Sequence, residues 1–226
     1  MSTTATTSRG AGAKAAGHGF FLVLEGVEGA GKSTQARRLT SRLEEAGVRC
    51  LMAREPGGTP GGERIRDVVL DPGLELGAEA ELLLYLASRA EFVSRIVRPA
   101  LEGGRLVIAD RYELSTLAYQ GLARGLGLEK VRRLNRWATG GLKPDAVVLL
   151  RVDPSTGRRR KEGAPDRLES ESGEFFRRVA EAYDELARNE PEVVVVDGDG
   201  SADDVERRVI DQLASRWPGT FDVLRR

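Results

Sequence analysis

The sequence predicts an α/β fold in which a parallel, five-stranded sheet carries helices on both faces. Five short apolar runs alternate along the 226 residues with segments of helical periodicity, and strands separated by helices form parallel sheets. A glycine-rich turn joins the first apolar run to the first helix. There is neither an internal repeat nor a linker-like stretch, so residues 19–226 are expected to form one domain.

The individual elements follow from apolar spacing and from the residues that end each segment. Gly47 is expected to stop the first helix, Pro99 to kink the third, and residues 54–59 to form a loop because they hold Pro and paired Gly. The expected strands are 20–24, 48–53, 106–109, 146–152 and 193–196. The expected helices are 32–46, a segment through Ile65 and Val69 that ends near Asp71, 78–101, 128–138 and 202–216.

The composition excludes several classes of protein. Lys plus Arg and Asp plus Glu number 35 each, so the zero formal charge gives no electrostatic argument for a nucleic-acid or membrane partner. Cys50 and His18 are the only residues of their kinds, which excludes a disulfide framework, a zinc cluster and a Ser-His-Asp mechanism. Residues 1–18 lack an apolar core, so we expect a disordered tail, no secretory signal and a cytoplasmic protein.

The glycine-rich turn fits the P-loop pattern G-x-x-x-x-G-K-[ST] without a gap, between a strand and a helix. Its backbone N–H groups and the helix N-terminus would hold the phosphates of ATP. Lys32 would reach the β and γ phosphates, and the Ser33 hydroxyl would bind Mg²⁺. The expected ATP-binding residues are Gly26, Val27, Glu28, Gly29, Ala30, Gly31, Lys32, Ser33 and Thr34. The motif leaves open whether the chain hydrolyses, switches or transfers.

Asp110 and Arg111 follow the expected strand 106–109. Ligands of α/β sheets bind at the carboxyl ends of the strands, so we expect this pair to face the P-loop. Asp110 would hold Mg²⁺ through water, and Arg111 would clamp the phosphate of an acceptor with its planar fork. Taken alone, these two residues also fit a surface ion pair.

Two further patterns suit a phosphoryl-transfer enzyme. Residues 157–168 are basic and turn-rich, as in a mobile lid that excludes water and brings arginines to the transferring group; a solvated basic run is the alternative. Tyr85 and Arg89 are four residues apart on one helix, so they share a face that suits a nucleobase. An ordinary core position for Tyr85 is the alternative.

Taken together and in order, these residues resemble the thymidylate kinase family in its bacterial form, from about Phe20 to Trp217. The resemblance implies a P-loop kinase fold with a mobile lid, ATP as donor, dTMP as acceptor, Mg²⁺ as cofactor and a homodimer. The matching stretches are the P-loop with Glu28, Arg54–Thr59, Tyr85–Arg89, Asp110–Tyr112, Ser115–Gly121 and Asp166–Glu169.

The resemblance also implies a role for each matching residue. Tyr85 would stack on thymine, Tyr119 would crowd the sugar 2′ position, and Glu28 would hold the 3′-hydroxyl. The P-loop holds no arginine, so the lid would supply the catalytic one, and which arginine does so stays open. Catalysis would fall to Lys32, Arg111, Arg158, Arg160 and Arg167; dTMP binding to Glu28, Glu55, Pro56, Arg66, Tyr85, Arg89, Arg111, Thr116, Tyr119 and Gln120; the metal to Ser33 and Asp110.

The expected reaction is ATP plus dTMP giving ADP plus dTDP, for dTTP synthesis. An acceptor phosphate is already ionised near neutral pH, so the reaction requires no strong base, in agreement with a chain nearly free of histidine. One alternative is a kinase for another nucleoside monophosphate, or for a deoxynucleoside with Glu55 as base. A P-loop switch that hydrolyses slowly is the other.

Overall fold

The computed structural model describes residues 19–160 and 164–225. The expected N-terminal tail and part of the expected lid lie outside these residues. The described chain contains one five-stranded sheet with the strand order β2-β3-β1-β4-β5, and every pairing is parallel, which confirms the predicted architecture. The strands are β1 Phe20–Glu25, β2 Cys50–Arg54, β3 Leu106–Asp110, β4 Ala146–Arg151 and β5 Val193–Asp197.

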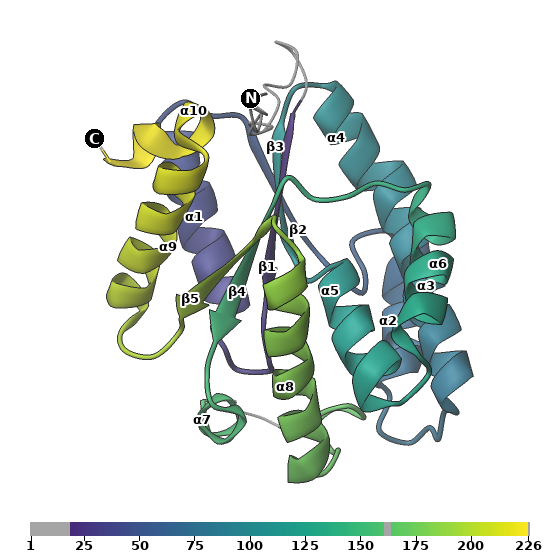
Figure 1. Cartoon of the computed structure of the whole chain (residues 1–226). Coiled ribbons are helices and arrows are strands. Elements are labelled where there is room, and N and C mark those ends of the chain that lie inside the picture. Colours follow the sequence, from purple (N-terminus) through teal and green to yellow (C-terminus); the bar gives the residue numbers. More distant parts are fainter. Residues whose placement is uncertain (1–18, 161–163, 226) are drawn as a thin grey trace, which may run out of the picture.

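Helices cover both faces of this sheet (Figure 1). On one side lie α1 (Lys32–Glu45), α9 (Ala202–Arg216) and the short α10 (Pro218–Phe221), followed by the final turn η3 (Asp222–Arg225). The other helices are α2 Pro60–Leu70, α3 Ala78–Phe92, η1 Val93–Val97, α4 Arg98–Glu102, α5 Glu113–Thr116, η2 Leu117–Ala123, α6 Leu128–Thr139, α7 Pro154–Arg159 and α8 Gly173–Asn189. No described helix is long and apolar enough to cross a membrane.

The strand order brings two turns to the same edge of the sheet. Strand β1 is central and pairs with β3, in a register that aligns Leu24 with Asp110. The P-loop follows β1 directly, and Arg111 follows β3. Because all strands are parallel, both turns leave from carboxyl ends, where the strand order reverses and α/β proteins bind their ligands.

Strand β2 begins later than the predicted 48–53, because the backbone N–H of Val48 takes part in the cap that follows α1. Gly47 is left-handed at φ 81°, and its N–H bonds to the carbonyl of Glu44. The N–H of Val48 bonds to Leu43 at 2.8 Å. These two bonds form a Schellman motif, which uses the backbone groups that a strand would need.

The predicted helix 78–101 is three consecutive segments. Residues Val93–Val97 form the π-helical turn η1 between α3 and α4, directly before Pro99. Proline lacks an N–H and its ring crowds the carbonyl four residues earlier, so a widened turn at this point accommodates it. The predicted irregularity is therefore present, but it precedes the proline.

The sequence prediction lacks the short segments α7, α10 and η3, and it also lacks two longer helical segments. One is α5 with η2, which carries Ser115 to Gly121. The other is α8, whose Ser172 side chain caps its N-terminus and which buries Phe176, Val179 and Tyr183 at helical spacing. The cap and the spacing were readable signals in a segment that the sequence analysis left without a helix.

Candidate active site

The P-loop lines one side of a cavity of about 540 Å³. Residues 28–34 line it, whereas Gly26 and Val27 do not. Gly29 adopts φ 70°, and a Cβ there would stand 1.9 Å from the carbonyl oxygen of Gly157 in α7. Glycine is thus required for both reasons, because it permits this conformation and lets the loop touch the start of the expected lid.

Lys32 is buried beneath this loop. Its Nζ donates to the carbonyls of Gly26 at 3.0 Å and Val27 at 2.7 Å. Burial, followed by the nearby charge of Arg111, lowers the pKa of Lys32 to about 8. Nearby groups therefore neutralise the positive charge of Lys32 poorly in the free protein, and an anion bound in the loop would stabilise the charged form of this side chain.

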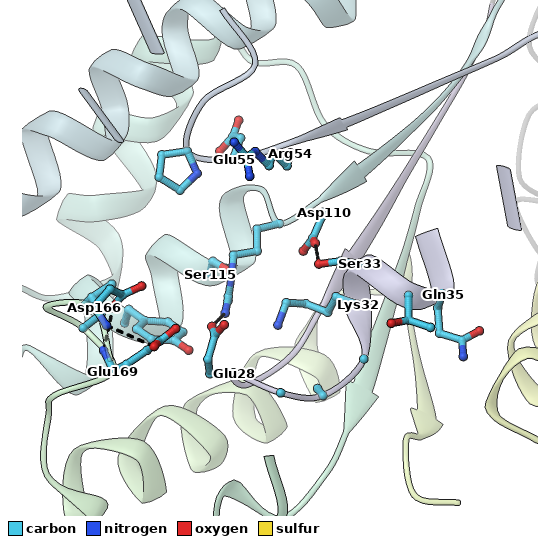
Figure 2. A pocket seen from close by; sticks show the side chains of 18 of the residues that line it. Glu28, Lys32, Ser33, Gln35, Arg54, Glu55, Asp110, Ser115, Asp166 and Glu169 are labelled. Atoms are coloured by element: carbon cyan, nitrogen blue, oxygen red, sulfur yellow. Dashed lines mark hydrogen bonds and ion pairs between the residues drawn. The ribbon is translucent and has the colours of Figure 1, made fainter. Parts of the chain in front are cut away.

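Ser33 and Asp110 meet across the junction of β1 and β3. The Ser33 hydroxyl donates to Oδ2 of Asp110, as Figure 2 shows. A hydroxyl and a carboxylate oxygen side by side are the hard donors that Mg²⁺ takes from P-loop proteins, the remaining ligands coming from phosphate and water. These two residues fit the expected magnesium site.

Arg111 lies against the P-loop. Its backbone is left-handed at φ 74°, an uncommon conformation for a residue with a Cβ, and its N–H bonds to Leu24 in β1. The guanidinium donates to the carbonyl of Gly26 at 3.2 Å and to the carboxylate of Glu28 at 2.7 Å. The contact with Glu28 is an ion pair. The strained backbone turns the side chain of Arg111 toward the donor loop.

Two residues that the sequence analysis missed, Tyr183 and Glu25, support Arg111 together with Ser115. The guanidinium also donates to Ser115 Oγ at 2.9 Å and Tyr183 Oη at 3.3 Å. Behind them, Glu25 is fully buried and accepts from Ser115 Oγ at 2.6 Å and Tyr183 Oη at 3.0 Å. An acidic residue at the end of an otherwise apolar strand was a readable signal for Glu25. No pattern in the sequence pointed to Tyr183, because only the fold brings α8 to this position.

All ten residues expected to bind dTMP line the same cavity. They come from the P-loop, the loop after β2, α2, α3, and the segment from Arg111 through η2. Arg66 of α2 donates to the carbonyl of Pro56 at 2.9 Å. The ten are Glu28, Glu55, Pro56, Arg66, Tyr85, Arg89, Arg111, Thr116, Tyr119 and Gln120.

Arg89 is fully buried, and its guanidinium has acceptors on every side. Both Nε and Nη2 lie 2.7 Å from Oε2 of Glu55. Nη1 donates to Thr116 and to Asn135, and Nη2 to the carbonyl of Tyr112. A base carbonyl would therefore have to share one of these donors. Burial raises the pKa of Glu55 to about 7 despite this ion pair.

The three expected lid arginines have different surroundings. Arg160 lines the cavity and donates to Gly198 at 3.0 Å and Asp199 at 3.1 Å. Arg158 lies over the ring of Phe176 at 5.6 Å, and Arg167 pairs with the buried Glu81 at 2.6 Å. Of the three, only Arg160 lines the cavity in the described conformation.

One cavity thus offers a phosphate-binding loop from one wall and a guanidinium from the facing strand end, joined by a hydroxyl–carboxylate pair. This arrangement holds two anionic ligands end to end. The fold and the site together define a P-loop phosphotransferase.

Comparison with known proteins identifies the family. The sequence model of thymidylate kinase matches residues 24–209. The thymidylate kinase of Deinococcus radiodurans is 47% identical over 201 residues, which cover 88% of the chain and 98% of the relative. Those of Desulfosudis oleivorans and Halothermothrix orenii are 47% and 44% identical, over 86% and 84% of the chain and 96% and 94% of the relatives. The chain belongs to the thymidylate kinase family, and it is an enzyme that phosphorylates dTMP to dTDP with ATP as donor.

Proposed function

We propose that this cavity carries out the transfer by holding the γ-phosphorus of ATP in line with a phosphate oxygen of dTMP. The placement of Arg111 carries the proposal. Its guanidinium touches the P-loop carbonyl of Gly26 at 3.2 Å while its position at the end of β3 faces the acceptor wall. It can therefore bind the acceptor phosphate next to the group that Lys32 holds.

The remaining residues supply positioning and charge. Ser33 and Asp110 would hold Mg²⁺, which neutralises phosphate charge when bound. Lys32 stays protonated once an anion lies beside it and binds the β and γ phosphates. Arg160 reaches the cavity from the end of α7 and would bind the transferring phosphoryl, while Arg158 and Arg167 support the segment around it. An ionised acceptor phosphate requires no base.

Steady-state kinetics with separate titration of the two substrates tests this assignment. Arg111→Ala should raise the KM for dTMP by roughly 30- to 1,000-fold and the KM for ATP by less than about threefold, since removing a charged hydrogen bond costs about 2–4 kcal/mol. Arg105→Ala, which removes an arginine that bonds to the carbonyl of Cys50 outside the cavity, is the control. A larger effect on ATP than on dTMP would contradict the assignment.

We also propose a cytoplasmic homodimer that buries the face formed by α2, α3 and α6. These helices pack together, with α3 in contact with both neighbours. Leu83 on α3 is 59% exposed and Trp137 on α6 is 84% exposed, which is a large apolar area for a free surface. Light scattering should report a dimer for the native chain and a monomer for Leu83→Arg. Gln212→Arg on α9, across the sheet, should stay dimeric; a monomeric native chain would refute the dimer.

A further inference from the structure

Two facing helical segments frame the place where Tyr85 lines the cavity. Along α3, Glu81, Tyr85 and Arg89 recur every four residues and share one face. Thr116 and Gln120 lie opposite, on α5 and η2. Arg89 donates to Thr116 at 2.8 Å, and Gln120 donates to Glu81 at 2.7 Å. Two buried polar contacts therefore lie on either side of the aromatic ring along α3.

The contact between Glu81 and Gln120 fixes the orientation of an amide. Glu81 is fully buried, and its second oxygen, Oε2, lies 3.0 Å from Nη2 of Arg124 and 2.6 Å from Arg167. Arg124 makes a longer contact to Oε1 as well, from Nε at 3.3 Å. Burial alone would raise the pKa of Glu81, but hydrogen bonds from Arg124 and Gln120 outweigh burial and lower that pKa. Glu81 is thus an ionised carboxylate that only accepts hydrogen bonds.

Because Glu81 only accepts hydrogen bonds, the side-chain amide of Gln120 has a single possible orientation. Its Nε2 must face Glu81, so its carbonyl oxygen Oε1 is the atom that Gln120 offers to the cavity it lines. Among the described residues, no group donates to that oxygen. The carboxylate, the amide and a base edge would then form a chain of hydrogen bonds with every donor pointing toward Glu81.

We propose that Glu81 is a positioning residue that makes the acceptor site select a base with an N–H at ring position 3. This inference rests on the dTMP kinase function and adds the origin of its base selectivity. Thymine and uracil carry an imide N–H at that position, and Gln120 Oε1 accepts it. Cytosine carries a lone pair there, so it meets an oxygen and leaves two acceptors facing each other.

The contacts of Arg124 and Arg167 with Glu81 predict that one substitution at Glu81 reverses the base preference of the site. In Glu81→Gln, the two shorter arginine contacts, at 3.0 and 2.6 Å, favour an oxygen at the position of Oε2, and the single longer contact of Arg124 at Oε1 is given up. The new amide nitrogen then points at Gln120, which turns over and offers its own Nε2 to the cavity. The variant site would donate to ring position 3 and favour cytosine.

The test compares kcat/KM for dTMP and dCMP in purified full-length protein. Turnover of dTMP by the unaltered chain checks the underlying function by itself. Glu81→Gln should lower the ratio of dTMP to dCMP by roughly a hundredfold, because one favourable contact is lost and one is gained. Arg124→Gln disturbs the same buried cluster and leaves the Glu81–Gln120 contact in place, so its ratio should stay within threefold.

A double variant provides rescue and covers the case in which Glu81→Gln does not fold. Glu81→Gln with Gln120→Glu exchanges the two side chains, keeps the charge of the cluster and again offers an oxygen to the base. Its preference for dTMP over dCMP should return to within about tenfold of the native ratio. An unchanged ratio in a folded Glu81→Gln protein, an equal fall in Arg124→Gln, or a double variant without dTMP preference would each overturn the proposal.

Discussion

Removing one hydroxyl from each of two buried tyrosines should have different effects on the free energy of unfolding. Tyr183 is 2% exposed, and its hydroxyl donates to Glu25 at 3.0 Å while accepting from Arg111 at 3.3 Å. Tyr119 is 5% exposed, and its hydroxyl has no hydrogen-bond partner among the described residues. Both side chains belong to the same cluster around Arg111, whose guanidinium lies 5.4 Å from the ring of Tyr119.

The size of each change in the free energy of unfolding follows from the hydrogen bonds that the tyrosine hydroxyl makes. A hydrogen bond to a charged group contributes about 1.5–3 kcal/mol, and Glu25 keeps donors from Ser115 and Tyr112 when Tyr183 is truncated. We therefore expect Tyr183→Phe to lower the free energy of unfolding by about 1–2 kcal/mol, or the melting temperature by roughly 2–8 °C for a domain of this size. Tyr119→Phe removes an unsatisfied buried hydroxyl and should be neutral or stabilising.

Thermal and urea unfolding of both variants, with the native chain alongside, measure the difference. Tyr183→Phe should also raise the KM for dTMP several-fold without changing that for ATP, because Arg111 loses part of its support. Equal melting temperatures for the two variants would refute the reasoning, as would a larger loss in Tyr119→Phe.

Three further outcomes are expected. Lys32 has a pKa of about 8 in the folded protein and 10.5 as its ordinary value, so between these pH values only the unfolded state keeps the proton. The free energy of unfolding of the free protein should therefore increase as the pH rises from 8 to 10.5. ATP binds the charged form, so its affinity should fall above pH 8, and calorimetry in two buffers should detect proton uptake at pH 8.5 that is absent in Lys32→Met. Tyr119→Val should lower the preference for dTMP over its ribonucleotide by roughly tenfold in kcat/KM if Tyr119 crowds the sugar; an unchanged ratio would exclude that role. Gly29→Ala should destabilise the protein several times more than Gly47→Ala, since both have positive φ and only the first meets a backbone oxygen, that of Gly157; equal melting curves would contradict the packing.

The candidate site was predictable wherever chemistry is local in sequence. The P-loop, the pair Asp110–Arg111 and the i, i+4 pair Tyr85–Arg89 are short patterns, and all of their residues except Gly26 and Val27 line one cavity. Contacts between distant segments were not predictable. Glu25 and Tyr183 are 158 positions apart, and Glu81 and Gln120 are 39 apart. No local periodicity encodes such pairings.

The sequence by itself determined the alternation of strands and helices, because burial of apolar residues follows their spacing, and it determined the donor loop, because a phosphate cradle needs consecutive backbone N–H groups. Only the tertiary structure decided how the acceptor wall is oriented. Arg89 is surrounded by protein acceptors, Gln120 is turned by Glu81, and Arg111 is held by Glu25 through Ser115 and Tyr183. A buried polar group must find its partner wherever the packed helices bring one, and that choice is made by three-dimensional proximity.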